Sequence, residues 1–260
     1  EHILLFKFRY FYPLFFVLVI LAIINHKLFK MKKIITLILC LNFSILLCQE
    51  NFWNDVLLEV PSPETSNVIK LIDGFYSKID FPEGVGLSVS RIAYKGENMR
   101  ATHILSFLSK SSQSLSDFLN SLTGPSWDSY IKEMRKYIID GTRRSAGTSF
   151  LVFNEDQIQP IGQVWTFKIK DFDSFTSSCA KLMNSINLDG FVAIGQIVHG
   201  VSDGENAYIY GTYPDLNSAF ITGPKNELEQ KAFNSFFSEM SNSEAEYNQS
   251  FTRVLLKSYP

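Results

Sequence analysis

Two short sequence marks occur twice in this chain, and this repeat constrains the fold more than any other feature. The tripeptide Gly-Glu-Asn at 96–98 recurs at 204–206, and the dipeptide Gly-Pro at 124–125 recurs at 223–224. Each tripeptide lies between two strand-like runs, and each dipeptide opens a helix-like segment. Because the copies of both marks lie roughly 100 residues apart, the pattern predicts two units of the same plan.

Residues 31–48 are typical of a targeting segment. Met31-Lys32-Lys33, followed by an apolar run to Leu47, has the plan of a secretory signal peptide with cleavage before Gln49. The alternative is a lipoprotein signal with an acylated Cys48, which the bulky Leu47 disfavours. We therefore expect an exported protein, periplasmic or secreted, with lipoprotein anchoring at Cys48 as the weaker alternative.

Residues 1–30 have a different character. We interpret them as an over-extended reading frame, because the chain begins at Glu1 and Met31 resembles a natural start. The alternative is a membrane segment, although the apolar run Phe11–Ile24 is shorter than the roughly 20 residues that a span needs. Both alternatives leave the folded part to two predicted units, 49–158 and 159–260, neither of which spans a membrane.

Charge, cysteine content and missing motifs exclude several function classes. The chain has 24 basic and 26 acidic residues, of which six basic residues and one acidic residue precede Gln49. Residues 49–260 therefore have 18 basic and 25 acidic residues and a net charge of −7. A nucleic-acid-binding protein would show a basic surface instead. Cys179 is the one cysteine beyond residue 48, so no intrachain disulfide is expected. The chain has no P-loop, Rossmann glycine pattern, paired-cysteine zinc site, H-E-x-x-H motif or nucleophile elbow.

Hydrophobic periodicity predicts the order β-α-β-β-α-β in each unit. Ser62 or Thr65 is the expected cap of the first helix, and Ser114 to Asp117 resembles a capping box. The expected strands are 55–60, 85–94, 99–108, 149–153, 163–169, 191–201, 207–213 and 251–256, and the expected helices include segments near 65–75 and 125–138 and others starting at 173 and 224.

This element order, with the paired marks, resembles the dimeric α+β barrel superfamily over roughly residues 53–259. The resemblance implies an α+β fold in which two tandem ferredoxin-like βαββαβ units form a pseudo-dimeric α+β barrel around a central cavity. Because both units belong to one chain, it also implies a monomer with an internal pseudo-two-fold axis. Members include quinone-forming monooxygenases, haem-degrading enzymes, chlorite-dismutase-like haem proteins and stress-response proteins, so the fold does not define the function.

The candidate ligand-binding residues are His103, His199, Tyr208, Tyr210 and Trp165. The resemblance places both histidines on hairpins that would wall the cavity, where one could be an axial haem ligand or a proton shuttle. The alternative is a structural histidine, since His103 shares a strand face with apolar residues. Tyr208 and Tyr210 could form an aromatic ligand wall or pack beneath helices, and Trp165 has a position typical of core packing.

Other polar features have simpler explanations. Turn chemistry accounts for both Gly-Glu-Asn copies, although their Glu could bind a ligand or cation. Arg143 and Arg144 are expected to be a solvated loop pair, with anion binding as the alternative. Cys179 lies on an apolar helix stripe and is expected to be a buried hydrophobe.

We rank three functions for this sequence. The first is a non-catalytic exported protein that binds a small apolar ligand or serves as a structural module, without metal or cofactor. The second is a cavity enzyme of the monooxygenase or haem-handling type, which would need His103 or His199 to face the cavity with Tyr210 or Trp165. The third is a cell-surface interaction protein, which a large exposed apolar patch would indicate. The ranking leans against an enzyme and against nucleic acid as a partner.

Overall fold

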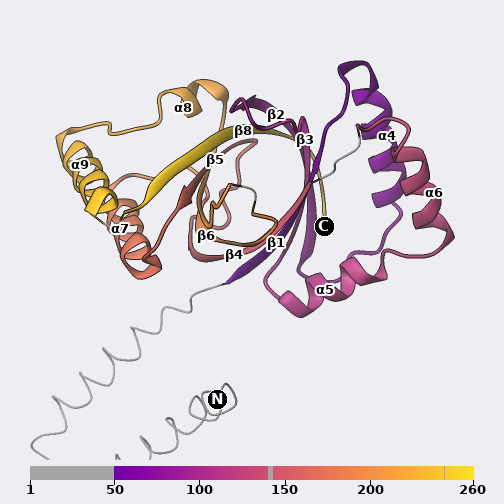
Figure 1. Cartoon of the computed structure of the whole chain (residues 1–260), viewed down its shortest axis with the longest axis horizontal. Helices are drawn as coiled ribbons and strands as arrows, with labels where there is room; N and C mark the ends of the chain where they lie inside the picture. Colours follow the sequence, from indigo (N-terminus) through magenta and orange to yellow (C-terminus); the bar gives the residue numbers. More distant parts are fainter. Residues whose placement is uncertain (1–49, 140–142, 202, 243) are drawn as a thin grey trace, which may run out of the picture. The chain divides into compact units, whose positions relative to one another are not determined.

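Eight antiparallel strands close into a barrel at the centre of the molecule (Figure 1). The computed structural model describes residues 50–260 except 140–142, 202 and 243, so the predicted segments 1–30 and 31–48 lie outside the described residues. The strands are β1 (Asn51–Leu58), β2 (Val85–Lys95), β3 (His103–Ser109), β4 (Arg143–Phe153), β5 (Ile161–Lys168), β6 (Val192–His199), β7 (Ala207–Tyr213) and β8 (Glu246–Tyr259).

The strand order around the barrel is β1-β3-β2-β8-β5-β7-β6-β4. Strands β1 to β4 are therefore neighbours in the order 4-1-3-2, and β5 to β8 repeat that order as 8-5-7-6. Antiparallel pairing of β2 with β8 and of β4 with β6 joins the two halves and closes the ring. Closure leaves no unpaired edge strand, which removes a common route to aggregation.

Helices cover the outside of the barrel in two groups (Figure 1). One group lies beside the first four strands and the other beside the last four. The helical elements are the 3-10 turn η1 (Ser62–Glu64), α4 (Thr65–Tyr76), α5 (Ser112–Ser121), α6 (Pro125–Met134), α7 (Phe172–Ser185), α8 (Leu216–Phe220) and α9 (Glu227–Asn242). In the described part of the chain, no helix is long and apolar enough to cross a membrane.

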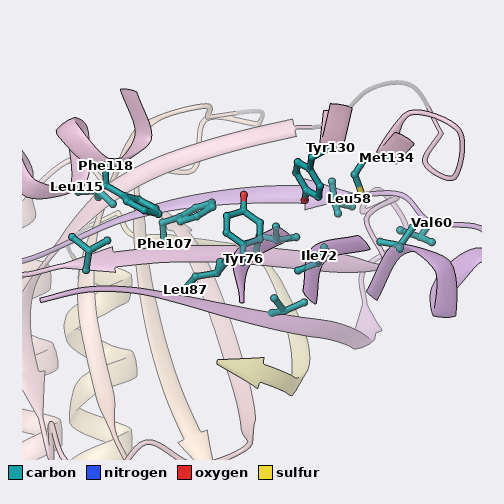
Figure 2. Close-up of a cluster of buried hydrophobic side chains, with 14 residues drawn as sticks. Leu58, Val60, Ile72, Tyr76, Leu87, Phe107, Leu115, Phe118, Tyr130 and Met134 are labelled. Atoms are coloured by element: carbon teal, nitrogen blue, oxygen red, sulfur yellow. The ribbon is translucent and has the colours of Figure 1, made fainter. Parts of the chain in front are cut away.

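Two apolar cores fill the space between the helices and the outer face of the barrel. In the first core, Tyr76 of α4 contacts Tyr130 of α6 and Phe107 of β3 in edge-to-face geometry (Figure 2). In the second, Phe175 and Cys179 of α7 are fully buried against the sheet. Cys179 is thus a buried residue, and burial raises the pKa of its thiol to about 12, which keeps it protonated and unreactive.

Several predicted boundaries and caps are wrong. Ser111, not Ser114, caps α5, because its hydroxyl accepts a hydrogen bond from the backbone amide of Ser114. Neither Ser62 nor Thr65 caps α4, whose N-cap residue is Glu64. Local patterns locate a helix more reliably than its N-cap residue. Where several polar residues follow one another, the side chain of each could accept the hydrogen bond from a backbone amide of the first turn.

The helices that follow the two Gly-Pro dipeptides also differ from expectation. In the first half α6 begins directly at Pro125 but ends at Met134, because the chain then turns back and the amide of Ile139 bonds to the carbonyl of Glu59. In the second half the long helix begins at Glu227, after the unpredicted short helix α8, which Asp215 caps. Ile138, which the predicted helix included, therefore lies beyond the end of α6.

The two Gly-Glu-Asn copies occupy the same topological position but not the same environment. Each lies in the loop between the second and third strands of its half. Glu97 is exposed, whereas Glu205 is 3% exposed. Gly204 adopts a φ of 84°, which favours glycine, and Gly96 does not have a positive φ. The repeat therefore predicts the location of the turns but not their detailed geometry.

Candidate active site

A cavity of about 630 Å³ lies inside the barrel, and residues from all eight strands line it. Side chains alternate across each strand, so Trp53, Asp55 and Leu57 of β1 face the cavity while Leu58 packs in the outer core. The inward positions of β2, β3 and β4 are rich in serine. These small side chains leave open the space that larger residues would fill: Ser88, Ser90, Ser106, Ser145 and Ser149.

A carboxyl and a guanidinium are joined inside the cavity through a bridging hydroxyl. Nη1 of Arg253 on β8 donates a hydrogen bond to Oγ of Ser106 on β3, at 2.8 Å. Ser106 is paired in register with Asp55 on β1 and donates a hydrogen bond to its carboxylate. The guanidinium of Arg253 also lies over the ring of Tyr210, 4.4 Å from its centroid, in a cation–π contact.

Burial controls the protonation of this pair. It raises the pKa of the Asp55 carboxyl, and the charge of Arg253 and the hydrogen bond from Ser106 offset this rise only in part. For Arg253, burial lowers the pKa, but Tyr210, Asp55 and Tyr208 together raise it further than burial lowers it. The site therefore combines a permanent positive charge with a carboxyl that accepts a proton more readily than a solvated one.

Beside this pair lies a hydrogen-bonded group of three side chains. Nε1 of Trp53 donates to the hydroxyl of Tyr208 at 2.9 Å, and the rings meet edge to face with centroids 5.5 Å apart. The Tyr208 hydroxyl also lies 2.8 Å from Oγ of Ser149. Burial raises the pKa of Tyr208, so its hydroxyl stays protonated and retains a hydrogen to donate.

Inward-facing glycines make room for these aromatic rings. A Cβ on Gly162 would lie 2.6 Å from Cε2 of Tyr210, and one on Gly195 would lie 2.6 Å from the hydroxyl of Tyr208. Both distances are shorter than real carbon contacts allow. The positions of Tyr208 and Tyr210 therefore depend on the absence of a side chain on the neighbouring strand.

Ion pairs stand at the two ends of the cavity. At one end Lys110, directly after β3, pairs with Glu155 in the connection between the halves, at 2.6 Å. At the other end Nη2 of Arg143 donates to Oε1 of Glu205 at 2.9 Å. The backbone amide of Asp203 donates to the other oxygen of Glu205. Arg143 and Arg144 therefore begin β4 and do not form the expected loop pair: Arg144 is exposed, but tertiary folding brings Arg143 to the second Gly-Glu-Asn turn, where its side chain is paired and 39% exposed.

The structure separates the five candidate residues into two groups. Tyr208 and Tyr210 line the cavity, but His103, His199 and Trp165 do not. His103 is 2% exposed on the opposite side of β3, where Nδ1 meets the hydroxyl of Thr102 and Nε2 has no partner among the described residues. His199 is exposed at the end of β6, and Trp165 packs against the second outer core.

This placement bears on haem, the cofactor that was considered as an alternative. An axial histidine ligand must face the group that it binds. His103 faces the helices and His199 faces solvent, so neither fits a haem held in the cavity. Among the described residues, no cluster of His, Cys, Asp and Glu has the arrangement of a metal site.

Asp55, Ser106 and Arg253 were not among the sequence-based candidates. Arg253 is the one charged residue of the predicted strand 251–256, and Asp55 is one of two in the predicted strand 55–60, with Glu59; these charges were the available signal. A charge on an otherwise apolar strand must be solvated or paired. Their pairing could not be inferred from sequence, because they lie on strands from opposite ends of the chain that are not neighbours in the sheet.

Comparison with solved structures identifies the fold. A "putative monooxygenase" from Fusobacterium nucleatum subsp. nucleatum superimposes with a TM-score of 0.56 at 12% identity, over 80% of this chain and 93% of that chain. This chain has the dimeric α+β barrel fold. A "putative monooxygenase" from Lactobacillus acidophilus (TM-score 0.51, 12% identity, 80% and 93% covered) and an anthrone oxidase-like protein (0.51, 9%, 81% and 93%) also match.

No family model matches the sequence, and no characterised protein matches it in a sequence search. The α+β content and the eight-stranded barrel agree with the predicted fold class. The first-ranked function is wrong, however. The matched structures are named for oxygenase or oxidase activity, which overturns the expectation of a non-catalytic module and favours the alternative, a cavity enzyme.

Proposed function

We propose that this protein is a cavity enzyme of the monooxygenase type, acting on a small, largely apolar ring compound that carries an acidic proton. One observation carries the proposal: the barrel cavity holds a half-buried carboxyl with a raised pKa, Asp55, bridged by Ser106 to a permanent cation, Arg253. The names of the matched structures support the reaction class, and the walls of the cavity support the substrate class.

The chemistry follows from the roles of these side chains. The Asp55 carboxylate accepts a proton from an activated CH₂ group of the substrate, and burial favours this transfer by raising the pKa of the acid. The guanidinium of Arg253 stabilises the resulting anion. The anion then gives electrons to molecular oxygen, so that in sum CH₂ and O₂ become C=O and H₂O. The hydroxyl of Tyr208 can donate a hydrogen bond to an oxygen formed in the cavity.

Oxygen consumption tests this proposal. Anthrone is a suitable probe, because its CH₂ group is acidic and its oxidation product absorbs at longer wavelength. We expect the purified protein to consume oxygen and form the quinone, and we expect Asp55→Asn to lower kcat by about 100-fold or more, as loss of a general base does. The matched control is Asp80→Asn, which changes an exposed carboxylate outside the cavity.

Two results would contradict the proposal. One is the absence of oxygen uptake with anthrone and with related hydroquinones. The other is a rate that survives in Asp55→Asn as fully as in Asp80→Asn, because the cavity carboxyl would then have no part in the reaction.

We further infer that the halves are tandem ferredoxin-like units and that the protein is a monomer. The repeated strand order, 4-1-3-2 and 8-5-7-6, supports the first statement. Closure of the barrel within one chain supports the second, because each barrel strand already has two neighbours. A stable dimer in analytical ultracentrifugation would contradict the monomer. Export through residues 31–48 remains a proposal from sequence, which N-terminal sequencing of the cellular protein would test.

A further inference from the structure

The charged residues that line the cavity fall into three pairs of opposite sign. Lys110 with Glu155 and Arg143 with Glu205 form direct ion pairs at the two ends. The third pair, Asp55 and Arg253, differs: within the described residues no ion pair joins them, and Ser106 lies between. The middle of the cavity therefore holds a cation, Arg253, that contacts its acidic partner Asp55 only through the hydroxyl of Ser106.

Arg253 has hydrogen-bonding capacity beyond its contacts in the structure. A guanidinium carries five N–H donors. Nη1 uses one of them for Ser106, and a further hydrogen bond goes to Tyr210, whose ring also supports the flat face of the guanidinium. A planar cation that is held from one side in this way presents donors at the spacing of a carboxylate or similar oxyanion.

Apart from the serines and a few other polar side chains, the remaining walls of the cavity are apolar. Leu57 and Ile104 line it on the first half, and Val164, Ala193 and Ile197 line it on the second. Apolar walls with a few convergent polar groups are typical of a site for a small, mostly apolar molecule. The cavity of about 630 Å³ has room for a fused ring system.

We propose that the cavity binds a planar apolar monoanion, with its charged oxygen on Arg253, and that Asp55 takes up a proton from solvent as the anion binds. This inference rests on the same site as the proposed function. It deepens that function, because an anion on Arg253 beside a protonated Asp55 is also the state that follows proton transfer from a neutral substrate.

The proton uptake follows from electrostatics in a low-dielectric site. Arg253 is the group that most offsets the effect of burial on the pKa of Asp55. When a ligand anion takes up the charge of Arg253, the Asp55 carboxylate loses this compensation and gains a negative neighbour, so protonation relieves both costs. The other titratable groups that line the cavity are Tyr208 and Tyr210, Tyr259, and the two ion pairs at its ends.

A matched set of probes tests the anion without any mutation. The probe is 9-anthracenecarboxylate, and the control is 9-anthracenemethanol, which has the same rings and no charge. We expect the carboxylate to bind the wild-type protein at least about 10-fold more tightly by calorimetry, which corresponds to about 1.4 kcal/mol. Equal affinity for the two probes would overturn the proposal.

Variants then identify the residues. Arg253→Gln should remove the preference for the carboxylate probe. Arg253→Lys keeps the positive charge but loses the paired N–H donors of the guanidinium, so it should reduce the preference without removing it. The matched control is Arg91→Gln, which makes the same change at an exposed position on neighbouring β2. If Arg91→Gln lowers the affinity as much as Arg253→Gln does, general electrostatics and not a site would explain binding, and the proposal would be wrong. Circular dichroism shows that each variant is folded.

The pH dependence of binding tests the proposed proton uptake by Asp55. Affinity of the wild-type protein for the carboxylate should fall as the pH rises between about 5 and 9, by up to 10-fold per unit above the pKa of ligand-free Asp55. In Asp55→Asn this dependence should disappear. A wild-type affinity that stays constant over this range would overturn proton uptake. Because these are binding measurements, they can succeed where oxygen consumption fails, so failure of the proposed function and failure of this inference are distinguishable.

Discussion

The two faces of the barrel wall are built from the same strands but follow different rules. The outer face carries Val, Ile, Leu and Phe side chains that are buried under the helices in two apolar cores. Figure 2 shows the first of these cores. The inner face carries serines, glycines, aromatic hydroxyls and three pairs of charges around an open cavity. The outer face thus provides stability, and this permits the inner face to keep polar groups and empty volume that would otherwise destabilise a domain of this size.

The largest effect should separate the faces by stability. Ile194 and Ile197 both lie on β6, but Ile194 is 0% exposed in the outer core and Ile197 lines the cavity. Ile194→Ala should lower the free energy of unfolding by about 2–5 kcal/mol, because it leaves a void in close packing. Ile197→Ala should cost less, because its side chain already borders empty space. Chemical denaturation of both variants measures the difference, and equal losses would contradict the comparison.

A smaller effect should appear when a methyl group is added to the inner face. Gly162→Ala would push against Tyr210 and against Cγ of Arg253, which lies 3.1 Å from the added carbon. We expect a loss of about 1–3 kcal/mol, as overpacking typically costs, together with loss of binding in the cavity. Gly211 on β7 meets no atom closer than 3.4 Å, so Gly211→Ala is the control and should be tolerated. Thermal melting measures both variants. A lower melting temperature for Gly211→Ala than for Gly162→Ala would contradict this account.

The smallest effect concerns a titratable group on the outer face. Burial lowers the pKa of His103, and Arg91 lowers it further. In the unfolded chain the imidazole of His103 takes up a proton near pH 6.5, whereas in the folded chain it does so only at a lower pH. The stability contribution is therefore complete above that pH and is lost as the pH falls toward the lowered pKa, at up to about 1.4 kcal/mol per unit.

Unfolding free energies measured between about pH 7 and pH 5 test this sign. His103→Gln should flatten the dependence, because no buried imidazole then remains to titrate. His199→Gln makes the same change at an exposed position and is the matched control. If His199→Gln flattened the curve instead, burial of His103 would not be its cause.

Much of the fold could be predicted from sequence because it depends on local periodicity. The strand 207–213 was predicted with the bounds of β7, and the apolar stripes of α4 and α7 mark the sides that they bury. The start of β4 was missed, since its first residues, Arg143 to Ser149, include small and polar side chains that face the cavity and so lack an apolar alternation. Helix α8 was missed because five residues are too few for a periodic signal.

The candidate site was harder to predict, because its chemistry depends on which strands meet and on which face a side chain lies. His103 and Asp55 are both polar residues on apolar strands, and nothing local tells that one faces helices and the other a cavity. Tyr208 and Tyr210 were identified from their shared strand face, but not their partners Trp53 and Arg253, which lie on other strands. The two Gly-Glu-Asn copies look alike, although Arg143 is present near only one of them.

The amino-acid sequence by itself determined the α+β class, the repeated element order and the faces of the helices, because these depend on spacing along one segment. The tertiary structure decided everything that depends on closure. When β2 meets β8 and β4 meets β6, one face of every strand is turned inward. Asp55, Ser106 and Arg253 then meet inside the barrel, where partial burial raises the pKa of the Asp55 carboxyl and Arg253 offsets this rise only in part.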